Sequence, residues 1–370
     1  MWRYGIGLAM LATGAAQSGR YWDSLFRWRL QEVQYGQAQN VNGSPQNLWA
    51  TFYLPEPDAE RQRPIVVLLF GGGYISGSRR DSDITHIARY FAARGYVCAT
   101  IDYRIGLAGL PSAREWINAS LRAMYDLKAF IRYLKRSVAE SGNPWGIDTN
   151  RIYVGGSSAG AFTALHAAFL TQASELAEVP QADLNYLAAQ GGLEGTSGNP
   201  GYSSRFQAVF SLSGGMLRTS WIQPGKVTAV VAMHGTADAV VPYNRGLLPA
   251  IQLPAEGGYA IDSAARAAGL YHALFSWPGV GHVPYGTQQS VNPTYMRDVE
   301  TFLRFHFYQW NSRFTAGLTG GEAFSLGEPW EMWSLDGRFW GRVQQVTDLP
   351  SGVWLLRSPG VPQGRAVFRP

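Results

Sequence analysis

The sequence predicts an α/β protein with a mostly parallel central sheet flanked by helices, followed by a small all-β C-terminal module. Between Pro64 and about Trp310, short apolar runs alternate with longer helical patterns. These runs are apolar throughout, which is typical of strands buried on both faces of a parallel sheet. After Asn311 the pattern changes to short strands separated by Gly and Pro turns, which predicts a separate β module.

The N-terminal segment, residues 1–16, has the features of a signal peptide. Arg3 precedes a short apolar run that ends in the small residues Gly14, Ala15 and Ala16. That run is too short to cross a bilayer comfortably, and no later apolar run reaches the length of a spanning helix, about 18 residues. We therefore expect a bacterial protein with no membrane span, exported via the periplasm and secreted or held at the cell surface. A buried N-terminal helix is the alternative.

The strands and helices of the α/β domain can be placed in chain order. Segments 32–39 and 47–55 alternate polar and apolar residues, as half-exposed antiparallel edge strands do. Apolar residues from Ile117 to Val138 recur at steps of three or four, which predicts one long amphipathic helix. Further core strands are expected at Pro64–Phe70, 96–104, 151–156, 206–213, 227–235 and 272–280, and further helices over 83–95, 160–170 and 292–310.

Segment 172–205 interrupts this alternation. It is long and rich in Gly and Ser, and it directly follows the helix expected at 160–170. Long insertions of this kind are usually functional, so we expect a cap or pocket wall over a site. The predicted organisation is a signal peptide at 1–16, an α/β domain at 17–312 and a small β domain at 313–370.

Composition and charge exclude several classes of protein. Hydrophobic residues make up 46% of the 370 residues and charged residues 15%, which indicates a folded core. The net charge is +5, but basic residues are scattered and no cluster exceeds a pair such as Arg79-Arg80, so no nucleic-acid partner is expected. Cys98 is the single cysteine and lies in an apolar run, which favours a buried inert thiol. His, Cys and Asp show no metal-ligand spacing, and we expect neither metal nor other cofactor.

Ser158 is the first candidate for a reactive group. It is the centre of Gly156-Ser157-Ser158-Ala159-Gly160, between an expected strand and an expected helix. A sharp strand-to-helix turn needs small flanking residues and exposes the central hydroxyl, which is the context of a nucleophilic serine. A serine hydroxyl also needs a base and a group that orients the base.

Asp238 and His282 can supply those two roles. Each lies in a loop that follows an expected strand, so that Ser158, Asp238 and His282 come in this order at the carboxyl ends of strands. Ligands bind at this edge of open α/β sheets. Either residue alone could be an ordinary loop residue, with Asp238 capping a turn, but together the three predict a catalytic triad.

The glycines at 71–73 can supply the donors that stabilise an oxyanion. They follow the strand expected at Pro64–Phe70, and we expect the amides of Gly72 and Gly73, together with that of Ala159, to point into one cavity. The alternative, a phosphate-binding loop, fails because neither Gly-Lys-Ser/Thr nor Gly-x-Gly-x-x-Gly spacing is present.

The sequence resembles the α/β-hydrolase superfamily, in particular its carboxylesterase and lipase branch with a triple-glycine oxyanion loop. The motifs FGGGYISGS, YR, GIDTNRIYVGGSSAG, HGTADAVVP and GVGH occur in the order of that branch, over roughly residues 45–310. The oxyanion loop usually begins with His or Tyr, and here it begins with Phe70. The resemblance implies an α/β-hydrolase fold and hydrolysis of a small-molecule or carbohydrate ester through an acyl-enzyme. It also suggests similarity to secreted esterases acting on acetylated or feruloylated polysaccharides.

The C-terminal tail is similar to a sorting domain of the type IX secretion system. The resemblance lies in SLDGR, VTDLPSGVWLLR and GRAVFRP, with Gly352-Val353-Trp354 where Gly-Val-Tyr is usual. It implies that the tail addresses the protein to the type IX export machinery. The alternative is a carbohydrate-binding or stabilising β module.

Other conspicuous residues are expected to have structural roles. Ser157 should fill the turn with its side chain away from the pocket, His166 should lie in the core, and His234 should orient the loop that carries Asp238. Turn capping or packing is expected of Asp148, Trp145, Trp277 and Tyr285.

Three functions remain open at this point. The first is a secreted serine carboxylesterase. The second is a prolyl-oligopeptidase-type serine exopeptidase, which shares fold and triad order but usually carries a large N-terminal β-propeller, whereas fewer than 50 residues precede the α/β core here. The third is a catalytically inactive hydrolase-fold binding protein, and this is disfavoured because nucleophile, acid, base and glycine loop are all present.

Overall fold

The computed structural model describes residues 19–315, 325–333, 339–345, 352–357 and 364–369, with side chains as far as residue 311. The signal peptide expected at 1–16 lies outside these residues. Among the described helices, none combines the length and the apolarity that crossing a membrane requires.

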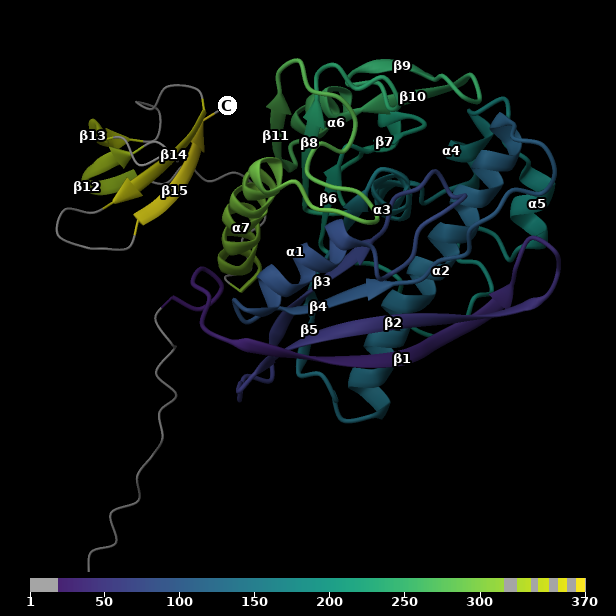
Figure 1. Ribbon diagram of the computed structural model, residues 1–370, viewed down its shortest axis with the longest axis horizontal. Coiled ribbons are helices and arrows are strands. Elements are labelled where there is room, and N and C mark those ends of the chain that lie inside the picture. Colours follow the sequence, from purple (N-terminus) through teal and green to yellow (C-terminus); the bar gives the residue numbers. More distant parts are fainter. Residues whose placement is uncertain (1–18, 316–324, 334–338, 346–351, 358–363, 370) are drawn as a thin grey trace, which may run out of the picture.

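An eight-stranded sheet forms the centre of the protein (Figure 1), in the order β1-β2-β4-β3-β5-β6-β8-β11. The first two strands pair antiparallel and β2 joins β4 antiparallel, whereas all pairs from β4 to β11 are parallel. This confirms the predicted α/β fold and its antiparallel edge. The strands are β1 (Arg27–Gln39), β2 (Pro45–Glu56), β3 (Arg63–Leu69), β4 (Val97–Ile101), β5 (Ile147–Ser157), β6 (Ala208–Leu212), β8 (Ala229–Gly235) and β11 (Tyr271–Trp277).

Helices cover both faces of this sheet. The β3-to-β4 crossover runs across the sheet in the opposite direction to the later crossovers, so right-handed crossovers place α1 on one face and α2, α3 and α6 on the other. The last helix, α7, contacts α1 and β5, which places it on the α1 face. These helices are α1 (Ser82–Ala92), α2 (Ala113–Glu140), α3 (Ala159–Phe169), α6 (Gly258–Ala267) and α7 (Pro293–Thr315).

The insertion at 172–205 is attached to α2. It contains two short helices, α4 (Ala173–Ala177) and α5 (Leu184–Ala189). Lys128 of α2 donates to the Leu193 carbonyl at 2.8 Å, and Arg132 of α2 donates to the Gly198 carbonyl at 2.9 Å. The backbone of the insertion thus provides acceptors for cations on α2 that are almost fully buried.

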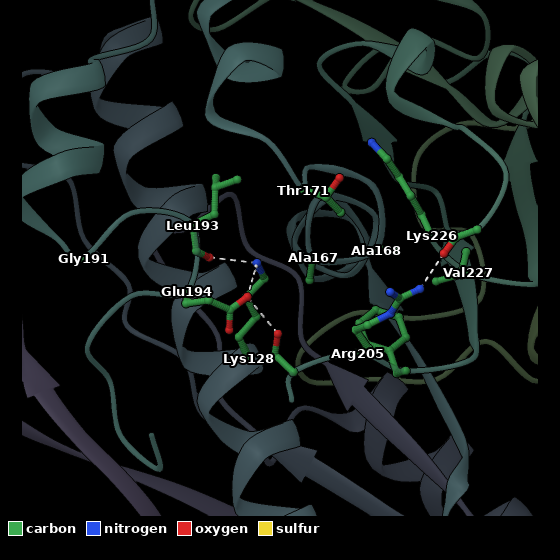
Figure 2. Close-up of a pocket in the computed structure, with 13 residues that line it drawn as sticks. Lys128, Ala167, Ala168, Thr171, Gly191, Leu193, Glu194, Arg205, Lys226 and Val227 are labelled. Atoms are coloured by element: carbon green, nitrogen blue, oxygen red, sulfur yellow. Dashed lines mark hydrogen bonds and ion pairs between the residues drawn. The ribbon is translucent and has the colours of Figure 1, made fainter. Parts of the chain in front are cut away.

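A cavity between the insertion and the last turn of α3 shows where this segment lies (Figure 2). Leu193 and Glu194 line it together with Ala167 and Ala168. The rise of a helix is about 1.5 Å per residue, so this end of α3 lies more than about 10 Å from the N-terminal end, where Ser158 is found. Residues 193 and 194 of the insertion therefore lie at the end of α3 remote from Ser158, and the cap expected of 172–205 stays a prediction.

A second, smaller sheet was not anticipated from the sequence. Strands β7 (Gly215–Met216), β9 (Arg245–Leu248) and β10 (Leu253–Gly257) pair antiparallel in the order β7-β10-β9, and a single 3-10 turn, η1 (Thr219–Trp221), follows β7. They occupy connections that follow β6 and β8. These strands are too short to show a hydrophobic period.

The C-terminal segment contains four strands, in agreement with the small all-β module expected there. They form an antiparallel sheet in the order β13-β12-β14-β15. The preceding helix continues to Thr315, slightly beyond the expected domain boundary at 312. The strands are β12 (Ser325–Trp333), β13 (Phe339–Gln345), β14 (Gly352–Arg357) and β15 (Gly364–Arg369). The sorting role of this module stays a prediction.

Candidate active site

Ser158 occupies a strained turn between β5 and α3. Its backbone has φ 49° and ψ −114°, a conformation that non-glycine residues rarely adopt. The turn also brings the backbone of this segment against β3: a Cβ added at Gly156 would lie 2.3 Å from the Leu69 carbonyl oxygen, and one at Gly160 would lie 2.4 Å from the same atom. The two glycines are therefore required by close approach of the backbone, and the turn exposes the Ser158 hydroxyl at the carboxyl edge of the sheet.

The structure brings together the three residues predicted as a triad. The Ser158 Oγ lies 2.9 Å from Nε2 of His282, and Nδ1 of His282 lies 2.6 Å from Oδ2 of Asp238. Ser158 follows β5, whereas Asp238 and His282 lie in the loops after β8 and β11. With Nδ1–H donating to the carboxylate, Nε2 is free to accept the proton of the serine hydroxyl. The catalytic roles themselves stay predictions.

The Asp238 side chain is buried, and both of its carboxylate oxygens have partners. Its Oδ1 accepts the amides of Val240 and Val241 at 2.8 and 2.9 Å, and its Oδ2 accepts His282 and lies 3.2 Å from Nε2 of His234. Burial by itself would raise the pKa of Asp238, but the hydrogen bonds from His234, His282 and the Val241 amide outweigh burial and hold that pKa well below its ordinary value. The carboxylate therefore stays ionised beside the imidazole.

The glycine loop lies directly against Ser158. A Cβ added at Gly71 would be 3.4 Å from the Ser158 Cβ. Gly72 and Gly73 have φ 106° and 63°, and the described hydrogen bonds within the loop run from later amides to the Gly72 carbonyl. The amides of Gly72 and Gly73 are not used in these bonds, and the amide of Ala159 is in the first turn of α3, where amides have no acceptor within the helix. The three predicted donors are thus available.

Aromatic side chains fix this loop to the rest of the site. The Tyr74 hydroxyl donates to the Ala159 carbonyl at 2.9 Å and lies 3.1 Å from Oγ1 of Thr163. Phe70, which stands where the resembling family usually has His or Tyr, stacks on Tyr103 with ring centroids 4.0 Å apart, and the Tyr103 hydroxyl donates to the Phe70 carbonyl at 2.8 Å. Phe70 is therefore a packing support for the loop.

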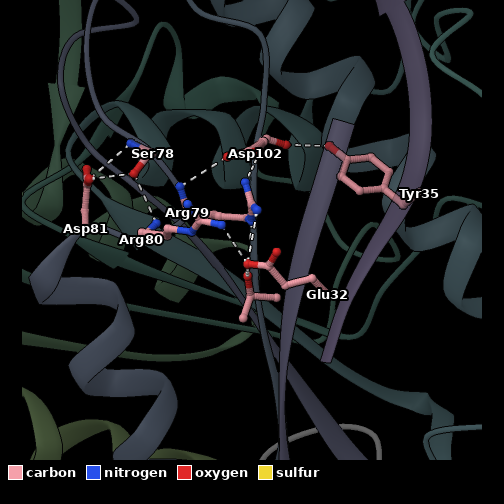
Figure 3. A network of polar contacts seen from close by, with 8 residues as sticks. Glu32, Tyr35, Ser78, Arg79, Arg80, Asp81 and Asp102 are labelled. Carbon is pink, nitrogen blue, oxygen red and sulfur yellow. Dashed lines mark hydrogen bonds and ion pairs between the residues drawn. The ribbon is translucent and has the colours of Figure 1, made fainter. Parts of the chain in front are cut away.

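An ion-pair network anchors the far end of the same loop to the sheet (Figure 3). Arg79 donates to Asp102 at 2.5 Å, to Glu32 at 3.2 Å and to the Thr51 hydroxyl at 3.1 Å. These partners belong to the β1, β2 and β4 region, and Glu32 also accepts from the exposed Arg80 at 3.0 Å. No sequence pattern predicted this network, because its members are far apart along the chain.

A buried polar cluster lies behind the nucleophile. The Ser157 hydroxyl is 2.8 Å from that of Tyr285, which donates to the Leu212 carbonyl at 3.1 Å, so Ser157 points away from Ser158 as expected. Nearby Asp83 is almost fully buried. Burial raises its pKa to about 6, although hydrogen bonds from the Ile84 amide and Ser157 partly oppose the rise.

The remaining residues singled out in the sequence have structural positions. His166 is buried in the core, and burial lowers its pKa to about 3. Asp148 accepts the Asn150 amide at 2.8 Å, as a turn-capping residue does. Cys98 is fully buried, which raises the pKa of its thiol. Within the described ranges no group of three or more His, Cys, Asp or Glu side chains could hold a metal ion. Buried packing positions are also taken by Trp145 and Trp277.

Part of the chain matches known esterases in sequence. Residues 51–192 match the BD-FAE family. The chain is 28% identical over 111 residues to Gut esterase 1 of Caenorhabditis elegans and 30% identical over 129 residues to Carboxylesterase 3 of Homo sapiens. These segments cover 30% and 35% of this chain but only 19% and 21% of the two relatives. The chain thus spans about a fifth of the length of the curated relatives it matches.

The solved structure of esterase 2 from Thermogutta terrifontis, phosphorylated by paraoxon, resembles the whole α/β domain. It aligns with a TM-score of 0.55 over 79% of this chain and 96% of that chain, at 21% identity. At that identity the likeness shows the fold alone. Residues 51–192 are thus similar in sequence to the BD-FAE family, and the α/β domain shares its fold with this esterase. The structure adds the arrangement of Ser158, His282 and Asp238 described above.

Proposed function

We propose that the protein is a carboxylesterase that hydrolyses carboxylic esters through an acyl-enzyme on Ser158. The observation that carries the proposal is the continuous hydrogen-bonded series from Ser158 Oγ through His282 to the buried Asp238 carboxylate. A serine hydroxyl becomes a useful nucleophile when a base of this kind removes its proton.

Acylation begins when Ser158 Oγ attacks the ester carbonyl carbon. His282 Nε2 takes the hydroxyl proton, and Asp238 stabilises the imidazolium that forms. The negative charge moves to the carbonyl oxygen, where the amides of Gly72, Gly73 and Ala159 can donate to it. When the tetrahedral intermediate collapses, the bond to the leaving oxygen breaks, and His282 returns its proton to that oxygen to release an alcohol.

Deacylation repeats these steps with water. His282 Nε2 takes a proton from a water molecule, whose oxygen attacks the acyl carbon. The second tetrahedral intermediate breaks at the Ser158 Oγ–carbon bond, and the imidazolium returns its proton to Ser158. The products are a carboxylic acid and the regenerated enzyme.

Short acyl and feruloyl esters of polysaccharides are the proposed substrates. The matched BD-FAE family, whose members are bifunctional feruloyl and acetyl esterases, supports this class. Two exposed apolar side chains adjoin the catalytic loops: Ile75 follows the glycine loop and is 62% exposed, and Val240 follows Asp238 and is 51% exposed. Exposed apolar side chains in these two loops suit an acyl or aromatic group better than a charged one.

Export and cell-surface or extracellular location are further proposals. They are supported by the signal-peptide pattern at residues 1–16 and by the similarity of the C-terminal β module to a type IX sorting domain. Export of a reporter protein fused to residues 313–370 by a host with that system would support them, and retention of the fusion inside the cell would count against them.

A hydrolysis profile tests the proposed activity. p-Nitrophenyl esters of increasing acyl length, acetyl-xylan and methyl ferulate should be cleaved, and aminoacyl-nitroanilides should not. Ser158→Ala should lower kcat by about 10³-fold or more, whereas the matched control Ser157→Ala should keep an intact triad. Faster cleavage of the anilides would favour the exopeptidase, and a folded protein inert towards every substrate would favour the inactive binding protein.

A further inference from the structure

A second histidine contacts the carboxylate that orients the catalytic base. His234, near the end of β8, places Nε2 3.2 Å from Oδ2 of Asp238, the same oxygen that accepts from His282. Both the His234 and Asp238 side chains are completely buried. From the sequence, His234 was expected only to orient the loop, but its ring reaches the carboxylate itself.

The surroundings of His234 define its tautomer. The Gly258 amide donates to Nδ1 of His234 at 3.2 Å, so this nitrogen carries a lone pair and Nε2 carries the proton. The Nε2–H donates to the Val241 carbonyl, 3.1 Å away, and Oδ2 of Asp238 lies 3.2 Å from the same nitrogen. A proton on Nδ1 would face the Gly258 N–H, so Nε2 is the donating nitrogen of His234.

The backbone of Gly258 lies so close to the His234 ring that a larger residue at this position would crowd the histidine. A Cβ added at Gly258 would lie 3.0 Å from the His234 Cβ and 3.2 Å from its Nδ1. Glycine at the start of α6 therefore lets the amide reach the imidazole. Tyr243 packs edge-on against the ring, with centroids 5.8 Å apart. The ring is held by packing as well as by hydrogen bonds.

We propose that His234 is a positioning residue for the reaction, acting through Asp238, and this inference rests on the proposed esterase function. Oδ1 of Asp238 is held by the two loop amides, whereas Oδ2 is held by the two imidazoles. His234 fixes the direction in which Oδ2 faces His282 and keeps the buried carboxylate ionised. Without that donor, Oδ2 would have the catalytic imidazole as its remaining described partner, and a buried carboxylate with too few donors is costly.

Two variants of His234 separate positioning from loop structure. In His234→Gln the side-chain amide can reach the place of Nε2 and donate to Asp238. In His234→Asn the shorter side chain can accept from Gly258 but cannot reach Asp238. We expect the Asn variant to lose about 10- to 100-fold in kcat with KM nearly unchanged, and the Gln variant to recover most of that loss.

The pH dependence of kcat/KM distinguishes positioning from a purely structural role, because loss of a structural contact alone would leave it unchanged. A carboxylate with one donor fewer carries more charge towards His282 and stabilises its imidazolium, so the acid limb of the kcat/KM profile should move to higher pH in His234→Asn. Equal kcat and superimposable pH profiles in two folded variants and the wild type would overturn the proposal.

Nitrogen-15 NMR of the wild-type imidazoles tests the assignment without a variant. His234 should give the signals of an Nε2–H tautomer, with Nδ1 accepting the Gly258 amide. A charged ring or an Nδ1–H tautomer would overturn the proposal even if the enzyme is active. Conversely, the expected His234 signals in a protein that cleaves no ester would refute the esterase function while leaving the His234–Asp238 contact in place.

Discussion

Replacing Ser158 by glycine should give a more heat-stable protein than replacing it by alanine. Both substitutions remove the hydroxyl and its hydrogen bond to His282. They differ in the backbone, because alanine keeps the unfavourable conformation at φ 49° and ψ −114°, which glycine adopts readily. The difference between the two variants therefore isolates the strain stored at the nucleophile.

The size of the difference follows from two opposing effects. A non-glycine residue in a sparsely populated region costs about 1–3 kcal/mol. Glycine in turn increases the conformational entropy of the unfolded chain, which costs about 0.4–1 kcal/mol. The net advantage of glycine is about 0.5–2 kcal/mol in the free energy of unfolding, which for a domain of this size corresponds to about 1–5 °C in Tm.

Thermal melts of four variants measure this difference. Ser157 is the matched control, because it lies in β5 and has an ordinary strand conformation. There glycine should be less stable than alanine by about 0.5–1 kcal/mol, so the sign of the Gly-minus-Ala difference should reverse between neighbouring residues. A Ser158→Gly protein that melts at or below Ser158→Ala would refute the account of the strained turn.

Three further outcomes are expected. Gly72→Ala should lower Tm and kcat together, because its Cβ would lie 2.3 Å from the Ser76 carbonyl oxygen. The Cβ of Gly73→Ala meets no atom within 4 Å, but φ 63° is unfavourable for alanine, so this variant should lower kcat with a smaller loss of Tm than Gly72→Ala. A full oxyanion donor is worth about 3 kcal/mol, and near-native kcat in both variants would exclude the loop from catalysis. Because the pKa of Asp83 is raised to about 6, its contribution to stability is present below about pH 4 and lost as pH rises through about 6, by up to about 3 kcal/mol. Denaturant titrations at a series of pH values should show no such decline in Asp83→Asn. The same fall in the free energy of unfolding with pH in Asp83→Asn as in the wild type would contradict the prediction. Truncation after Thr315 should keep esterase activity within a few-fold and abolish export in the native host, and a folded but inactive product would show that the tail contributes to the site.

The sequence was sufficient to predict the parts of the fold that depend on local patterns. Strand–helix alternation indicated the parallel sheet, and the small residues around Ser158 indicated the turn that the structure places between β5 and α3. The order of Ser158, Asp238 and His282 predicted which side chains lie together, because the carboxyl ends of parallel strands share one edge.

Contacts between distant segments could not be predicted in the same way. The position of 172–205 depends on the face of α2 that carries Lys128 and Arg132. Which segment that face contacts is determined only when the helix packs in the folded protein. The spacing of His234 and Asp238 was visible in the sequence, but the direction of the ring is set by Gly258, which belongs to a later helix. Side-chain direction at the end of a strand is a property of the packed structure.

Peptide mapping after treatment with paraoxon tests the central claim most directly. A phosphoryl group should appear on Ser158, in proportion to the loss of esterase activity, because this hydroxyl is the one activated by His282. Ser157, which is hydrogen-bonded to Tyr285 and buried behind the turn, should stay unmodified. Modification of Ser157, or complete inactivation with Ser158 unmodified, would contradict the assignment of Ser158 as the nucleophile.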